Sequence, residues 1–337
     1  MARIGFVLLT HANPPQIDRL VRRLVRSYGP APIVCHHDFT KCPIDAAAYP
    51  DLHARVEFVV PWHQTSWAHI SLVDGYLEAL RRLYRRPDAP DWVVVLSGAD
   101  YPVRSADEVL SELDAGGADA YMQHAPVDPR AWRPPPDDAP EVPEAPPHGF
   151  MPGEGPRNTA FTAKRYGGAQ IPAPVLDAGR LRLRWRLLPY PALTAWLTPF
   201  SARFRCYAGS QWHTLGRRAA QHLVEWTDAN PWLRRFYATR LFSEESLPHT
   251  VLGNAPQLRI ANRSTHFIDW SAKQPNPTTL TLEHLPAILA SGAHFARKFD
   301  PAASAALLNA LDQRLDDVVA PATSGHLPAT SPTDSAG

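Results

Sequence analysis

The chain has 337 residues, enough for one large domain or two small ones. Its apolar fraction of 45% is ordinary for a soluble globule, and its formal net charge of +1 at pH 7 argues against nucleic-acid binding by bulk electrostatics. Three cysteines form neither a disulfide framework nor a CxxC zinc motif, and no apolar run reaches the roughly 18 residues of a membrane span. We therefore expect a cytoplasmic chain, with peripheral contact at the inner face of the membrane left open.

Strands alternate with helices in the first part of the chain. Short, strongly apolar runs predict strands at 4–9, 32–35, 58–60, 92–96 and 120–123. Apolar residues at helical spacing predict helices at 14–28, 67–84 and 105–113. This alternation indicates an α/β fold, with a doubly wound, mainly parallel sheet and flanking helices.

Polar side chains follow three of these predicted strands. His11, Asp38 and Asp100 each come just after an apolar run. In open α/β sheets, ligands bind beyond the carboxyl ends of the strands. We therefore group these three residues as candidates for one ligand site.

The second part of the chain is less regular. Residues 126–158 contain the run PPPDDAPEVPEAPP and predict a Pro-rich loop insertion. The alternation RLRLRWRLL over 180–188 fits an amphipathic edge strand or a membrane-surface segment, and a solvated structural face is the preferred interpretation. Further strands are predicted at 211–215, 258–260 and 266–270, and further helices at 217–226, 230–239, 244–252, 282–289 and 301–318. We predict a single domain over 1–318 and a disordered tail over 319–337.

Two adjacent carboxylates, Glu244 and Glu245, stand in the stretch SEESLPHT. Ser243 is a candidate N-cap, which would place both glutamates in the first turn of a helix. The helix dipole favours an ionised carboxylate there, and a rigidly held carboxylate suits a general base. Glutamates in a first turn are also ordinary features of structural helices, so this stretch alone does not decide its role.

Two adjacent cations, Arg297 and Lys298, stand between Phe295 and Phe299. Two cations held in place between aromatic side chains form a positive site that suits a diphosphate. The alternatives are an ion pair with Asp300 and a solvated pair of charges. The chain contains no Asp-x-Asp motif, which many nucleotide-sugar transferases use to hold a divalent ion.

The run His36-His37-Asp38 raises the alternative of a metal-dependent hydrolase. Adjacent histidines at the end of a strand point to opposite faces and cannot easily share one ion. We therefore predict no metal ligand in this chain.

The motifs together resemble the core-2/I-branching β-1,6-N-acetylglucosaminyltransferase and peptide O-xylosyltransferase family. The matching segments run in the family's order and cover roughly residues 4–300. They are VLLTHANP, VCHHDFT, the Ser66-Trp67 stretch that enters a helix, LSGADYPVRS, GSQWHTL, SEESLPHTVL and HFARKFD.

This resemblance implies a GT-A-like glycosyltransferase fold and an inverting, metal-independent transfer from a UDP-sugar to an acceptor hydroxyl of a glycan or another molecule. Glu245 matches the catalytic base, and its neighbour Glu244 would face the sugar or acceptor. Arg297 and Lys298 match the basic residues that take the place of a metal on the diphosphate. No cofactor is expected.

Other positions match the walls of the family's site. His11 and Asp38 match the uridine-binding wall, and Asp100 lies in the loop near the donor. Ser210 and Trp212 match a segment that faces the sugars.

The family's W-G-G segment is replaced by Trp67-Ala68-His69, and we expect the bulkier His69 to alter the pocket. The choice between N-acetylglucosamine and xylose stays open, as does the acceptor. A non-catalytic carbohydrate- or nucleotide-binding protein on the same fold is the alternative function, although such a protein would not need a base.

Overall fold

Alternate residues of the first strand face two separate hydrophobic cores. The computed structural model describes residues 2–44, 56–131, 166, 168–177, 180–187, 197–272 and 276–319. In β1 (Ile4–Thr10), Phe6 and Leu8 belong to one core, and Val7 and Leu9 belong to the other. This division follows from the two-residue period of a strand, and both faces are apolar because helices cover both sides of the sheet.

The central sheet has seven strands in the order β12-β6-β11-β4-β1-β2-β3. Neighbours pair in parallel except at β11, which runs antiparallel to both β4 and β6. The predicted α/β class, with a large and mostly parallel sheet, is therefore confirmed. The other strands of this sheet are β2 (Ile33–His37), β3 (Val56–Phe58), β4 (Trp92–Ser97), β6 (Ala120–Tyr121), β11 (Thr214–Gly216) and β12 (Ile260–Ala261).

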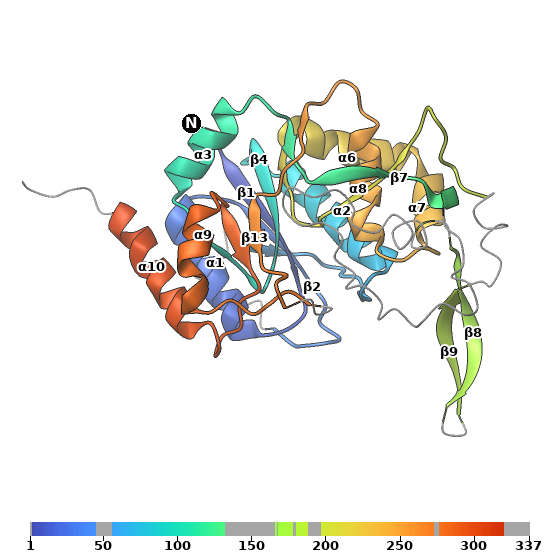
Figure 1. Cartoon of the computed structure of the whole chain (residues 1–337), viewed down its shortest axis with the longest axis horizontal. Helices are drawn as coiled ribbons and strands as arrows, with labels where there is room; N and C mark the ends of the chain where they lie inside the picture. Colours follow the sequence, from blue (N-terminus) through green and yellow to red (C-terminus); the bar gives the residue numbers. More distant parts are fainter. Residues whose placement is uncertain are drawn as a thin grey trace, which may run out of the picture.

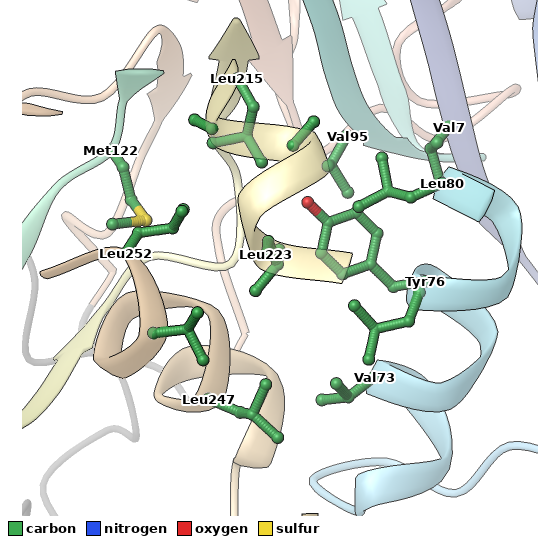
Figure 2. Packing of buried hydrophobic residues seen from close by; sticks show 14 of the residues in the cluster. Val7, Val73, Tyr76, Leu80, Val95, Met122, Leu215, Leu223, Leu247 and Leu252 are labelled. Carbon is green, nitrogen blue, oxygen red and sulfur yellow. The ribbon is translucent and has the colours of Figure 1, made fainter. Parts of the chain in front are cut away.

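Helices lie on both faces of this sheet (Figure 1). On one face, α1 (Pro14–Tyr28), α3 (Ala106–Ala115) and α10 (Ala305–Val319) contribute to the core that contains Phe6. On the other face, α2 (Ile70–Arg85), α6 (Arg217–Ala229), α7 (Pro231–Tyr237) and α8 (Leu247–Gly253) contribute to the core that contains Val7. Figure 2 shows this second core, where Tyr76 and Leu80 of α2 point toward Leu223 of α6 and Val95 of β4.

Three smaller sheets complete the described structure. A three-stranded sheet joins β5 (Asp100–Pro102), β14 (Phe295–Arg297) and β13 (His266–Ile268), and a two-stranded sheet joins β7 (His124–Val127) and β10 (Cys206–Gly209). The third consists of β8 (Gln170–Asp177) and β9 (Arg180–Leu187), which project from the rest in Figure 1. The arginine-rich run thus forms a strand, as one of the two interpretations predicted. Short elements also include α9 (Leu285–Ala290) and the 3-10 turns η2 (Pro129–Ala131), η3 (Ser243–Glu245) and η4 (Leu282–His284).

Two predicted irregular segments fall mostly outside the described residues. The expected loop over 126–158 was placed too early, because β7 runs to Val127 and η2 follows it. β7 extends into this Pro-rich stretch because β10, far away in the sequence, pairs with it. The remainder, 132–158, lies outside the described residues, and so does the expected tail beyond Val319. Among the residues with described positions, no helix combines the length and apolarity needed to cross a bilayer.

Candidate active site

Asp38 lies just beyond β2 and is fully buried. Its Oδ1 accepts hydrogen bonds from the backbone and hydroxyl of Thr40, at 3.1 and 2.6 Å, and its Oδ2 accepts from the backbone and hydroxyl of Thr65, at 2.8 and 2.9 Å. Burial by itself raises the pKa of Asp38, but these bonds outweigh burial and bring that pKa below its ordinary value. The carboxylate thus ties the end of β2 to the segment that leads into α2, and its contact with uridine stays a prediction.

The two histidines before Asp38 are occupied by separate contacts. The His37 ring shares a 2.8 Å hydrogen bond with the Thr10 hydroxyl and donates from Nε2 to the carbonyl of Cys42 at 2.7 Å. The ring of His36 accepts from the backbone N–H of His63 at 3.1 Å, and burial lowers its pKa to about 4. No group of three or more candidate metal ligands occurs within the described ranges. This arrangement gives no support to a hydrolase built on these residues.

His11 lies at the carboxyl end of β1, exposed at the edge of the sheet. Partial desolvation by the surrounding protein lowers the pKa of the His11 ring, and the charge of Lys41 lowers it further, against the opposing effect of Asp38. Lys298 also acts on His11 and lowers its pKa. The tertiary structure places His11 next to Asp38, because the backbone N–H of Asp38 donates to the carbonyl of Thr10 at 2.9 Å, and the single ligand site expected for these two residues and Asp100 stays a prediction. The structure also adds Lys41, which was not predicted; the scarcity of lysine in this chain was its only sequence signal.

Arg297 pairs with Asp100 inside the protein. The antiparallel register of β14 and β5 sets the two residues opposite each other, and Nε of Arg297 lies 3.2 Å from Oδ1 of Asp100. Burial raises the pKa of the fully buried Asp100, while the charge of Arg297 and hydrogen bonds from Ser97 act in the opposite direction. Asp300, the partner that one alternative proposed, instead accepts hydrogen bonds from the backbone at the start of the next turn.

The indole of Trp212 continues this chain of contacts. The guanidinium of Arg297 stacks over the Trp212 ring at 4.0 Å from its centroid, a cation–π geometry. Ser210, two residues earlier, is connected to α8 because Nε2 of His249 donates to the Ser210 carbonyl at 3.0 Å. Gly209 permits this approach because it has no side chain. A Cβ at this position would lie 1.8 Å from the backbone oxygen of Gln123 and 2.7 Å from the His249 ring.

The two glutamates do not start an α-helix. They lie in η3, and α8 begins only after Ser246, so the prediction of one helix over 244–252 was wrong. Pro248 explains the break, because its ring would clash with the carbonyl of residue 244 in a continuous helix. Ser243 is not an N-cap either, since its hydroxyl donates to backbone carbonyls at the end of α7 and just beyond.

Burial distinguishes the two carboxylates. The Glu244 side chain is 5% exposed, whereas the Glu245 side chain is only partly buried and is therefore more accessible to solvent. The turn is held from the other side by Phe242, whose backbone N–H donates to the carbonyl of Ala68 at 2.8 Å. Trp67 packs edge-on against the Phe242 ring at 4.9 Å between centroids and is 70% exposed. Glu245 therefore has the accessibility that a general base requires, with an exposed indole nearby.

The segment that replaces W-G-G supports this turn through its backbone. Ala68 has φ +59°, in the left-handed region that glycine adopts readily, and its partner Phe242 has φ +54°. His69 caps α2, because its Nδ1 accepts from the backbone N–H of Ser71 at 3.2 Å. We expected His69 to alter the pocket, and the structure gives it this local capping role.

The left-handed backbone of Ala68 predicts that Ala68→Gly stabilises the protein. Removing the Cβ relieves a cost of about 1–2 kcal/mol, partly offset by the entropy of glycine, so the free energy of unfolding should rise by roughly 0.5–1 kcal/mol. Urea denaturation measures this change. Ala79→Gly in the interior of α2 is the matched control and should lower stability by about 1 kcal/mol or more. A loss of stability in both variants would contradict the assignment of strain to Ala68.

The contacts connect most of the predicted residues. Hydrogen bonds join α8 and the turn before it to β10 and Ser210, since the Ser246 hydroxyl donates to the carbonyl of Tyr207 at 2.6 Å. Trp212 then leads to Arg297 and Asp100. Lys298 follows Arg297, and the next residue, Phe299, donates its backbone N–H to the carbonyl of Ala99 at 2.9 Å, beyond the carboxyl end of β4. The site therefore reaches from η3 to the carboxyl ends of β1 and β2. Two cavities of about 350 and 440 Å³ lie elsewhere, and none of Glu245, Arg297 and Lys298 lines either of them.

Known proteins resemble this chain over most of its length. The sequence model of a family described as Core-2/I-Branching enzyme matches residues 40–134 and 177–290, more than half of the chain. Human xylosyltransferase 1 is 26% identical over 343 aligned residues, which cover 93% of this chain and 30% of that protein. Xylosyltransferase 2 of Canis lupus familiaris is 26% identical over 289 aligned residues, which cover 79% of this chain and 28% of that protein.

The chain thus spans about a third or less of the length of these relatives. Among solved structures, a 4-diphosphocytidyl-2C-methyl-D-erythritol synthase from Anaerococcus prevotii aligns over 86% of this chain and 96% of its own, at 8% identity and a TM-score of 0.36. This structural similarity is too low to support an inference about fold or function.

Proposed function

The chain belongs to the Core-2/I-Branching enzyme family, and we propose that it is an inverting glycosyltransferase that moves a sugar from a UDP-sugar to an acceptor hydroxyl. The observation that carries this proposal is the set of contacts from the Glu245 turn, through Ser210 and Trp212, to Arg297, which Lys298 follows in the chain. It joins a candidate base to candidate anion-binding groups.

Glu245 acts as the general base in this proposal. Its carboxylate takes the proton of the acceptor hydroxyl while the hydroxyl oxygen forms a bond to the anomeric carbon. The bond from that carbon to the diphosphate breaks on the opposite side, and its electron pair leaves with UDP. Because attack and departure occur on opposite faces, the anomeric configuration inverts. Glu244, the neighbouring carboxylate, faces the sugar or the acceptor in this proposal.

Arg297 and Lys298 stabilise the negative charge that develops on the leaving diphosphate. Asp100 and Trp212 hold the Arg297 guanidinium in a fixed orientation, so little reorganisation is needed during the reaction. His11 and Asp38 border the nucleotide at the strand ends. These cations take the part that a divalent ion plays in many nucleotide-sugar transferases, and we propose that transfer needs no metal and no other cofactor.

The names of the relatives rank the donors to be tested, with UDP-xylose first and UDP-N-acetylglucosamine second. We expect both UDP and the correct UDP-sugar to raise the melting temperature, because a ligand at about 100 times its Kd stabilises the folded state by about 2.7 kcal/mol. GDP-mannose is the control for nucleotide specificity. Donor hydrolysis should persist in EDTA. Loss of turnover in EDTA with recovery in manganese would contradict metal independence, and the absence of a shift with every UDP-sugar would contradict the donor class.

A further inference from the structure

The proposed leaving group needs more positive charge than Arg297 and Lys298 supply together. The diphosphate of a nucleotide-sugar is a dianion, and departure of the sugar adds negative charge to it. Arg297 lies against the fully buried Asp100 at 3.2 Å, so its charge is compensated by a short ion pair and its guanidinium is held in place. Lys298, which is only partly buried, is then the more accessible cation of the predicted pair. A second cation near Lys298 would balance the diphosphate.

Lys41 is such a cation at the neighbouring strand end. Its Nζ lies 3.5 Å from Oδ2 of Asp38 and 3.5 Å from the hydroxyl of Thr65, both long for hydrogen bonds. Asp38 already accepts shorter bonds, of 2.6 to 3.1 Å, from Thr40 and Thr65. The carboxylate therefore does not depend on Lys41. The lysine side chain is 38% exposed, so its ammonium can turn toward a ligand.

Lys41 and Lys298 both act on the same exposed ring. His11 follows Thr10, whose carbonyl accepts a 2.9 Å hydrogen bond from the backbone N–H of Asp38, so β1 and β2 hold His11 next to the turn that carries Lys41. On the other side of β1, the backbone N–H of Phe299 donates to the carbonyl of Ala99 at 2.9 Å, so Lys298 lies near the carboxyl end of β4, the strand that pairs with β1. The charges of both lysines lower the pKa of His11, in addition to desolvation of the ring. The imidazole of His11 offers a further hydrogen-bonding partner to a ligand at this strand end.

We propose that Lys41 is a second diphosphate-binding cation, which acts with Lys298 across His11 at the carboxyl ends of β1 and β2. This inference rests on the proposed function, because it deepens the same donor site. It assigns direct contacts with the diphosphate to two accessible lysine ammonium groups, of which Lys41 would leave its long 3.5 Å contact with Asp38. The ligand group is a diphosphate ester, and the nucleoside contributes no charge to this contact.

The test compares UDP with uridine by isothermal titration calorimetry. Lys41→Gln should weaken UDP binding on the order of tenfold or more, because a charge-assisted hydrogen bond is lost, and should leave uridine binding unchanged. Lys41→Arg should retain most of the UDP affinity, since it keeps the charge. A higher salt concentration should reduce the difference in UDP affinity between Lys41→Gln and the unmodified protein, because salt screens the charge of Lys41. Arg218→Gln is the control, because Arg218 is 65% exposed and pairs with Asp119 at 2.9 Å.

Each result has one meaning for the proposal. Unchanged UDP affinity in Lys41→Gln, with the expected loss in Lys298→Gln, would overturn the role of Lys41 while leaving the proposed function in place. If Lys41→Gln weakens UDP binding and uridine binding equally and lowers the melting temperature, Lys41 has a structural role in the Asp38 turn. This result would also overturn the proposed role of Lys41 in diphosphate binding. Failure of the unmodified protein to bind UDP at all would instead contradict the proposed function.

Discussion

Replacing Glu245 with glutamine should lower kcat by about 10²–10⁴-fold, the contribution that general base catalysis typically makes. Glutamine keeps the size and shape of the side chain but cannot accept the acceptor proton. Affinity for UDP should hardly change, because the proposed diphosphate contacts lie on Lys298 and Arg297. Steady-state kinetics with the preferred donor, together with UDP calorimetry, separate these two effects.

Glu244→Gln is the matched control for this experiment. The two carboxylates are adjacent, yet Glu244 is 5% exposed and Glu245 is more accessible, so they cannot serve one acceptor oxygen equally. We expect Glu244→Gln to affect stability more than the chemical step, and its kcat should stay above that of Glu245→Gln. If Glu244→Gln is inactive and Glu245→Gln is nearly fully active, the general base is Glu244 and not Glu245. Full activity of both variants would show that neither glutamate of η3 is the general base.

Removing the charge of Arg297 should destabilise the protein by about 3–5 kcal/mol, because Arg297→Met leaves the buried Asp100 carboxylate without its partner. The change also removes the cation from the face of Trp212, so turnover should fall with stability. Urea denaturation gives the free energy of unfolding, provided that the slope with denaturant stays constant. Lys298→Gln is the contrasting variant. Since Lys298 is only partly buried, it should keep most of the stability and lose UDP affinity.

A double variant tests whether loss of the Arg297–Asp100 ion pair causes the destabilisation of Arg297→Met. Asn at position 100 can still accept the Ser97 hydrogen bonds and has no charge to compensate, so Asp100→Asn with Arg297→Met should recover part of the stability that Arg297→Met loses. Strictly additive losses in the double variant would show that the two side chains are not coupled. Destabilisation by less than about 1 kcal/mol in Arg297→Met would show that the pair is effectively solvated.

Local pattern was sufficient for the long elements and insufficient for the short ones. β1, α1, β4 and α6 follow from apolar runs or helical spacing, which depend on nearby residues alone. β10 and β7 were not predicted, because a strand of four residues has no distinctive pattern and forms only when its distant partner supplies hydrogen bonds. The helix predicted over 244–252 failed at Pro248. The proline was visible in the sequence, but its effect on the preceding turn was underestimated.

For the site, the sequence by itself determined which residue types were available and in which order. Motif resemblance identified the family, and the strand ends grouped His11, Asp38 and Asp100 as candidates for one ligand site, which stays a prediction. Tertiary structure alone decided which charges meet. The register of β14 against β5 pairs Arg297 with Asp100 and not with Asp300, three residues further along the chain, and the pairing of β1 with β2 brings the turn that carries Lys41 to His11. The physical reason is that an ion pair depends on distance in space, which strand register and sheet order set between segments that are remote in the sequence.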